Sequence, residues 1–417
     1  MIGKEALAPL RHRGFRAFLG ARFTSLLGNA IAPIAVAFAV LDLTNSASAL
    51  GMVLAARMIP TTVLMLFGGV IADRLPRHIV LVTANVVCFA TQAAAAGLLL
   101  SGHAKLWQIV VIEVLNGAAA AFTFPAMQGL MPHLVPRDQL QQANALSGLV
   151  RSGTAIGGAS LGGVIVGFLG SGWGLAVDAA SFGIAALFLI RLRIPPAEHV
   201  AGGSVAHDLR VGWREFVSRR WVWVIVAAFG IMNAILAGGW STLGPVVADG
   251  SFGRMAWGVV LSCQSAGTVL GMLVLLRFRP RHPLRLGMIG MLAEAPMLLV
   301  LGIDPEVVVL ASAALAAGVG GAMFGIAWET SLQQHVPHDK LSRVSSYDAL
   351  GSWVAMPVGQ LLAGPLAAAF GVEQVIVVGA VIYAGVAALT LVDPSVRGLT
   401  RADQADRSEP AEAGVPT

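Results

Sequence analysis

Two residues of opposite charge, Arg57 and Glu113, lie inside stretches that are otherwise apolar. Ionisable side chains are costly in hydrocarbon and are usually paired there. At 1.5 Å per helical residue, their depths from the same side differ by only about 3 Å, so the two side chains can pair. Burial favours a neutral carboxylic acid and a nearby guanidinium favours the carboxylate, so a changing separation would load and release a proton. We therefore predict proton coupling by this pair, with a static ion pair as the alternative.

Three other acidic residues in apolar stretches are weaker candidates for a role in proton coupling. Asp42 and Asp178 lie toward the outer ends of their stretches, where we expect them to be hydrated. Glu294 lies near the middle of a stretch, and we expect a structural role for it.

A third charged feature is GVIADRLPRH, residues 69–78, between two apolar runs. Gly69 permits close approach of a neighbouring helix, Asp73 suits the positive end of a helix, and Arg74 and Arg77 can pair with carboxylates. Such contacts exist only when the inner ends of the helices meet, so they can latch one of two alternating states. The alternative is a loop whose arginines only set topology.

The elements that position these residues follow from composition. The chain has 417 residues, of which 56% are hydrophobic and 12% charged, with a mean hydropathy of +0.78. A soluble chain carries about 25% charged residues. A helix needs roughly 20 apolar residues to span the bilayer. Twelve stretches qualify, at about 15–41, 49–71, 79–101, 107–129, 143–169, 173–192, 221–247, 256–276, 284–302, 306–333, 344–370 and 373–392.

Basic residues give the orientation. Of the 27 Lys and Arg residues, 22 fall on the side that carries both termini, and only Lys105 and Arg254 fall on the other. The remaining three, Arg22, Arg57 and Arg151, fall within the apolar stretches. This positive-inside bias predicts a multi-pass protein with both termini cytoplasmic. It also explains the sequence pI of about 9.9 without a nucleic-acid partner.

The sequence contains an internal repeat. Pro76-Arg77-His78 recurs as Pro280-Arg281-His282, and at the same spacing Asn29 corresponds to Asn233. A pair of glycines, Gly163 and Gly170, recurs as Gly364 and Gly371. The repeat predicts two six-helix pseudo-symmetric halves, 1–195 and 220–395, with a cytoplasmic linker at 196–219 and a disordered cytoplasmic tail at 396–417. A repeat of this kind is typical of transporters with one site between two rocking halves.

Several classes of function are not indicated. No Gly-x-x-x-x-Gly-Lys-Ser/Thr motif occurs, and no Cys or His cluster suggests a metal. Cys88 and Cys263 lie in separate apolar stretches, which does not favour a disulfide. We expect a monomer that is not an enzyme and has no cofactor, whose partners are a small-molecule substrate, protons and the lipid bilayer.

Four stretches carry a resemblance to a known family. They are 43–51 with the following Arg57 and Pro60, the loop at 69–78, FTFPAMQGLMPHLVPRDQLQQANAL at 122–146, and LQQHVP at 332–337. The chain resembles a twelve-helix member of the major facilitator superfamily, and within it the drug:proton antiporter branch that includes macrolide and siderophore exporters. The resemblance implies an all-α membrane fold of two halves. Because Arg277 stands where Asp73 maps in the second half, any latch is one-sided.

The resemblance also suggests cavity residues and a motif on the fifth helix. Asn29 and Asn233 fall on helices that line the cavity in this superfamily, and Asn116, Phe324 and Trp328 are further candidates. The fifth helix resembles the family's antiporter motif in its spaced glycines, with plain helix packing as the alternative. These glycines are Gly153, Gly157, Gly158 and Gly162.

We therefore expect a secondary active exporter of amphipathic small molecules that works by proton-coupled alternating access. An uptake symporter on the same fold is the first alternative, and a non-transporting membrane sensor or lipid-handling protein is the second. Arginine far outnumbers lysine, which is typical of a GC-rich bacterial genome and favours a bacterial cytoplasmic membrane, with antibiotic or natural-product export as the expected role.

Overall fold

The computed structural model describes residues 7–74, 77–128, 130–131, 134–136, 139–192, 213–277 and 280–400. Within these ranges it leaves out the side chains at 65–74, 77, 124–128, 141, 276, 338–339 and 342–343. All that follows refers to the described residues.

The first half of the chain forms a short 3-10 helix and six long helices. They are η1 (Ala8–Arg11), α1 (Arg13–Thr44), α2 (Ala47–Arg74), α3 (Arg77–Leu100), α4 (Leu106–Gln128), α5 (Leu140–Leu169) and α6 (Ser171–Ile190).

The second half has more breaks. Its elements are α8 (Arg220–Leu236), the π-helical η4 (Ala237–Leu243), α9 (Gly244–Gly250), α10 (Arg254–Arg277), α11 (Pro283–Met291), α12 (Glu294–Ile303), α13 (Val307–His335), α14 (His338–Trp353), α15 (Met356–Phe370), α16 (Val372–Val392) and α17 (Pro394–Arg397).

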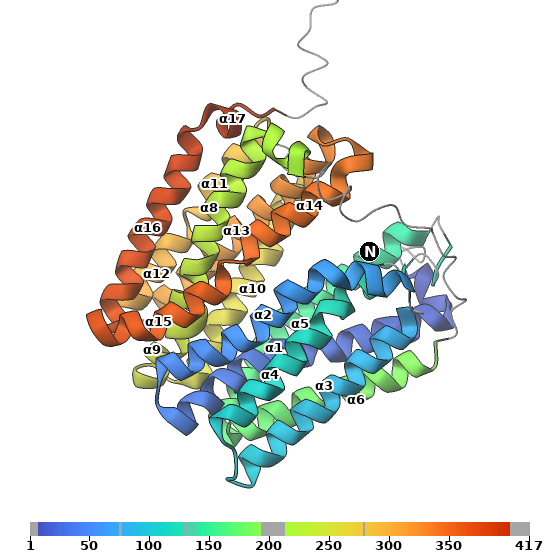
Figure 1. Cartoon of the computed structure of the whole chain (residues 1–417), viewed down its shortest axis with the longest axis vertical. Coiled ribbons are helices and arrows are strands. Elements are labelled where there is room, and N and C mark those ends of the chain that lie inside the picture. The colour runs from blue at the N-terminus through green and yellow to red at the C-terminus, as the bar shows by residue number, and fades with distance from the viewer. Residues whose placement is uncertain are drawn as a thin grey trace, which may run out of the picture.

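Twelve helical segments of the described chain are long and apolar enough to cross a membrane. They match the twelve stretches predicted from hydropathy, so the predicted all-α, twelve-helix fold is confirmed. Figure 1 shows the helices of the first half, drawn in blue to green, and those of the second, drawn in yellow-green to red, as two groups.

Two spans that we expected to be continuous are broken, and proline explains both breaks. Proline lacks an N–H group, and its ring clashes with the carbonyl four residues earlier. In a continuous helix the ring of Pro296 would clash with the carbonyl of Leu292, which directly follows the end of α11. The ring of Pro357 would clash with the carbonyl of Trp353, the last residue of α14. In the seventh span, Pro245 follows the π-helical η4, where the side-chain hydroxyl of Thr242 donates to the Ala237 carbonyl.

We call the end of the bundle at which α1 begins and α16 ends the inner end, after the predicted cytoplasmic orientation, and the opposite end the outer end. At the outer end one continuous buried apolar cluster includes residues from both halves, and we call it the outer seal. It includes Phe38, Val40, Leu50, Val53, Ile109 and Val166 from the first half, and Trp240, Leu243, Trp257, Leu301 and Leu310 from the second.

The inner end is organised differently. One buried cluster there contains residues of the first half only, such as Phe15 and Leu130, and another contains residues of the second half only, such as Trp221 and Tyr383. The described residues are therefore arranged as two halves that share a core at the outer end and have separate cores at the inner end.

Helix crossings between the halves follow the internal repeat. The outer part of α5 packs on α10, and α15 packs on α2. A Cβ atom on Gly163 of α5 would lie 2.8 Å from the Cα of Gly258, and one on Gly364 of α15 would lie 2.3 Å from the Cα of Ser48. These two glycines correspond in the repeat, and both are needed because backbone meets backbone at each crossing.

The linker and the tail each contain a described part. Residues 213–218 form a helix whose Phe216 is buried in the inner cluster of the second half. At the start of the predicted tail the chain is helical to Arg397 and buries Val396. Asp393 caps this last helix by accepting from the Ser395 N–H at 2.9 Å. Most of the predicted linker, at 193–212, and the tail from 401 to 417 lie outside the described residues.

Candidate functional site

The predicted partners Arg57 and Glu113 are in contact. Arg57 Nη1 lies 3.5 Å from Glu113 Oε2 and forms an ion pair that joins α2 to α4. The Glu113 side chain is 3% exposed, whereas the Arg57 side chain is 30% exposed. Their helices approach closely here, since a Cβ on Gly117 would lie 2.0 Å from the Arg57 carbonyl oxygen. The carboxylate is thus enclosed, while the guanidinium remains accessible.

Two predicted asparagines surround this pair. Arg57 Nη2 donates to Asn29 Oδ1 of α1 at 3.5 Å. Asn116, one turn after Glu113 on α4, accepts from Thr91 of α3 at 2.8 Å. The amide nitrogen of Asn116 is buried and has no hydrogen-bond partner among the described residues. Helices α1 to α4 thus all contribute polar side chains to one interior region of the first half.

This polar region lies directly inside the outer seal. Val53, one helical turn outward from Arg57, and Ile109, one turn outward from Glu113, both belong to the seal. A turn of helix advances about 5.4 Å, so the ion pair lies about one turn below the layer that closes the outer end.

The prediction that Asp178 is hydrated was wrong. We expected this residue to be hydrated near the outer end of its helix, but its side chain is fully buried. Neither carboxylate oxygen has a hydrogen-bond partner among the described residues. The reason lies in α1, where Gly28 leaves room for the carboxyl group: a Cβ there would lie 2.4 Å from Asp178 Oδ1. Asp42, in contrast, is exposed as predicted.

Two of the three candidates in the second half, Phe324 and Trp328, are packed in the inner cluster of that half. Phe324 and Trp328, predicted as a cavity wall, are 5% and 8% exposed and stack with their ring centroids 6.0 Å apart. Trp328 Nε1 donates to Asp348 Oδ2 at 2.9 Å. Asn233 donates to the Ser352 carbonyl at 2.9 Å. In this conformation these side chains join α8, α13 and α14, and a role in substrate binding stays a prediction.

The four glycines predicted as a motif on α5 divide into two pairs. A Cβ on Gly158 would lie 2.6 Å from that of Ala30, and one on Gly162 would lie 3.2 Å from the Ile31 Cα. Both therefore allow α5 to pack against α1. A Cβ on Gly153 or Gly157 would have no described heavy atom within 4 Å apart from the neighbouring residues and the backbone of its own helix.

The predicted latch lies outside the described side chains. The backbone is helical at Gly69, Asp73 and Arg74, and α3 begins at Arg77, but the contacts of these residues are not described. The latch stays a prediction.

An ion pair across the outer end was not predicted. Arg254 of α10 pairs with Asp42 of α1, donates through Nε to Asp249 at 2.7 Å, and lies 4.9 Å from the Phe38 ring centroid. Ser171 donates to the same Asp42 at 3.0 Å. The one available signal was that Arg254 is among the few basic residues on the outer side.

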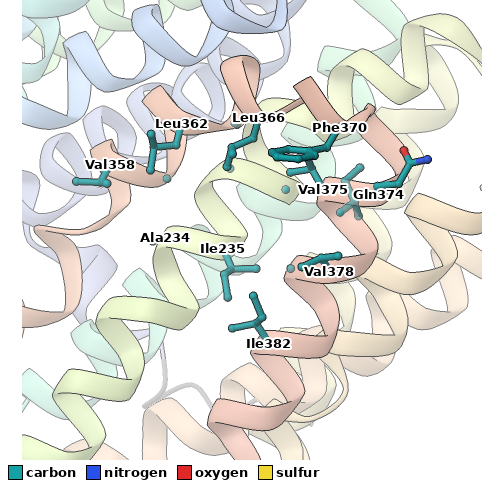
Figure 2. A pocket seen from close by; sticks show the side chains of 16 residues that line it. Ala234, Ile235, Val358, Leu362, Leu366, Phe370, Gln374, Val375, Val378 and Ile382 are labelled. Atoms are coloured by element: carbon teal, nitrogen blue, oxygen red, sulfur yellow. The ribbon is translucent and has the colours of Figure 1, made fainter. Parts of the chain in front are cut away.

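A separate hollow of about 580 Å³ lies in the second half (Figure 2). It is lined by α8, η4, α15 and α16, and its labelled side chains are apolar except for Gln374. It shares no residue with the Arg57 region. We therefore place the candidate site at Arg57 and Glu113 and not at this hollow. Among the residues with described positions, no group of three or more His, Cys, Asp and Glu could hold a metal ion.

Comparisons with known proteins agree with this architecture. The model of the Major Facilitator Superfamily matches residues 18–359. The chain is 25% identical over 367 residues to the enterobactin exporter EntS of Salmonella typhimurium, covering 83% of each chain. It is 26% identical over 355 residues to EntS of Escherichia coli, covering 83% of this chain and 82% of that one.

Solved structures with similar folds include two transporters. The nucleoside transporter NupG superposes with a TM-score of 0.72 at 16% identity and covers 90% of this chain and 98% of its own. A bacterial homologue of the human lysosomal transporter Spinster, in an inward-facing and unoccupied conformation, superposes with a TM-score of 0.72 at 15% identity, covering 92% and 97%. At these identities the likeness concerns the fold alone.

Proposed function

Because this chain belongs to the Major Facilitator Superfamily, we propose that it is a secondary active transporter that exports amphipathic small molecules in exchange for protons. Twelve membrane-spanning helices make it a multi-pass membrane protein. We place it in a bacterial cytoplasmic membrane with both termini in the cytoplasm, acting as a monomer.

The observation that carries the proposal is the Arg57–Glu113 pair. A carboxylate that is 3% exposed at membrane depth is costly to keep charged, and its guanidinium partner offsets that cost. When Arg57 moves away, Glu113 takes up a proton, and when Arg57 returns, Glu113 releases it. Such a switch couples a proton to a conformational change because the two residues belong to different helices.

The arrangement of the two halves supports alternating access. The shared core at the outer end and the separate cores at the inner end describe one state, which is closed outward. Opening the outer end requires separation of α5 from α10 and of α2 from α15. The one-sided latch that we propose at Asp73, Arg74 and Arg77 would hold the opposite state, in which the inner ends meet.

Different observations support the proposed direction of transport and the proposed class of substrate. The relatives named above are exporters of enterobactin, which favours outward transport by this chain. The interior near Arg57 and Glu113 has few fixed charges and adjoins an apolar seal. Neutral or cationic lipophilic compounds therefore suit this interior better than sugars or phosphates. Asn29, Asn116 and, from the second half, Asn233 are the proposed hydrogen-bonding groups for such a substrate.

Everted membrane vesicles that contain the protein test the proposal. After ATP addition establishes a proton gradient, an exporter accumulates a lipophilic cationic dye inside these vesicles, and an uncoupler abolishes the accumulation. An uptake symporter would drive the dye in the opposite direction. Absence of gradient-driven flux across a broad panel of lipophilic compounds would overturn the proposal.

A further inference from the structure

We infer that Asp178 is a third member of the Arg57–Glu113 site, and that it holds the proton while Arg57 is paired with Glu113. The inference rests on the proposed function in one respect, which is that this proton is the one exchanged for substrate. Its first support is charge balance. Two carboxyl groups in this site face one guanidinium, because Asp178 and Glu113 both interact electrostatically with Arg57.

Hydrogen bonding indicates which carboxyl group is neutral. Glu113 is in contact with Arg57, whereas both oxygens of the fully buried Asp178 have no partner among the described residues. An ionised carboxylate that is buried without a partner is strongly disfavoured, so the group stays neutral instead. With Glu113 ionised and paired, the single proton of the site belongs to Asp178.

The surrounding helices place Asp178 beside the pair. Two adjacent residues of α1 contact the two sides of the site: a Cβ on Gly28 would lie 2.4 Å from Asp178 Oδ1, and Asn29 accepts a hydrogen bond from Arg57. From α3, Cys88 interacts electrostatically with both Asp178 and Arg57. The titratable groups that interact with Asp178 from neighbouring helices are therefore Arg57, Glu113 and Cys88.

The exchange step then conserves charge. In the outward-closed state Arg57 is paired with Glu113, and Asp178 is a neutral acid. If Arg57 shifts toward Asp178 as the outer end opens, Asp178 gives up its proton to the Glu113 carboxylate, so that Asp178 becomes the ionised partner of Arg57 and Glu113 becomes the neutral acid. The site holds one guanidinium, one carboxylate and one carboxylic acid before and after an internal transfer.

Infrared spectroscopy of the purified full-length protein in lipid nanodiscs tests the inference without requiring a known substrate. At neutral pH the wild type should show, beside any absorbance from Glu294, the carbonyl absorbance of a protonated Asp178, which Asp178→Asn removes and Asp178→Glu retains at a shifted frequency. Arg57→Gln should increase this absorbance about twofold, because both acids then remain neutral. Glu113→Gln should remove it, because Asp178 then ionises against Arg57.

The control is Glu294→Gln, because Glu294 is another buried carboxyl group with an unpartnered oxygen, on the far half of the chain. The spectral change that Glu294→Gln causes should be the same whether or not any of the four substitutions above is also present. An acid absorbance that Asp178→Asn leaves unchanged would overturn the inference.

A transport measurement distinguishes this inference from the proposed function. In everted vesicles, Asp178→Asn should lose the uncoupler-sensitive accumulation of a lipophilic cationic dye that the wild type shows. If the wild type shows proton-driven accumulation and Asp178→Asn retains it, the inference fails while the proposed function stands. If the wild type shows no gradient-driven flux but the spectra are as expected, the charge assignment stands and the proposed function fails.

Discussion

Arg254 of the second half is paired with Asp42 of the first half at the outer end of the molecule. Because this pair joins the two halves, it stabilises the state in which the outer end is closed. The two side chains are partly exposed, at 24% and 43%, so the contribution of the pair is modest.

We predict that Asp42→Asn shifts the protein toward the outward-open state. Loss of a partly exposed ion pair costs up to about 1 kcal/mol, which changes the ratio of the two states by roughly fivefold. Distances between spin labels at Ser101 and Ser251, on exposed outer loops of the two halves, would report the change. Asp249→Asn is the control, because Asp249 belongs to the same half as Arg254. An equal shift in both variants would contradict the role of Asp42.

A second prediction concerns the crossing of α5 and α10. Gly163→Ala places a methyl group 2.8 Å from the Gly258 Cα, so the two backbones must separate. Overpacking of this kind costs about 1–3 kcal/mol, and we expect a smaller outward-closed population and slower export. Gly157→Ala on the same helix is the control, since its methyl group meets open space. Spin-label distances and vesicle transport measure both variants, and similar behaviour of the two would contradict the crossing.

A third prediction uses pH at the inner surface. Hydrogen bonds from Arg219 and Lys340 lower the pKa of Glu215 to about 2, from an ordinary value of about 4.3. A lowered folded-state pKa stabilises the folded protein above the ordinary value, and this stabilisation is lost as the pH falls toward 2. The melting temperature of the wild type should therefore exceed that of Glu215→Gln at pH 5 to 7. The difference should shrink below about pH 4, and a difference that grows in acid would count against the bridge.

A fourth prediction tests the indole of Trp328. Trp328→Phe keeps a ring against Phe324 but removes the N–H that Asp348 accepts. A buried group that loses its hydrogen bond costs about 1–3 kcal/mol, so thermal unfolding should occur at a lower temperature. Asp348→Asn retains an acceptor oxygen and should lose less. If the unfolding temperature fell more in Asp348→Asn than in Trp328→Phe, the prediction that the indole stabilises the protein through this hydrogen bond would be wrong.

Much of the architecture could be predicted because it follows from local composition. Twelve apolar stretches defined twelve helices, since length and hydropathy decide which segments can span a bilayer. Pairing of Arg57 with Glu113 could be predicted because helical depth is a linear function of residue number. The breaks before Pro296 and Pro357 carried only a partial signal in the sequence, because Pro33, Pro60 and Pro365 lie inside helices that stay continuous.

The features that could not be predicted from the sequence depend on contacts between residues that are far apart in the chain. The burial of Asp178 arises from Gly28, a bare position on another helix, and nothing near residue 178 indicates it. Arg254 and Asp42 are 212 residues apart and come together only when the halves close. Phe324 and Trp328 were predicted to line a cavity, but their side chains pack into the core of the second half.

The central claim, that Glu113 carries the coupling proton during export, is tested most directly in everted vesicles. Uncoupler-sensitive accumulation of a lipophilic cationic dye is compared among the wild type, Glu113→Gln and the control Glu329→Gln, an exposed carboxylate on α13. We predict that the wild type and Glu329→Gln accumulate the dye, whereas Glu113→Gln loses gradient-driven accumulation at least tenfold, equivalent to about 1.4 kcal/mol. Unchanged proton-driven accumulation in Glu113→Gln would contradict the claim.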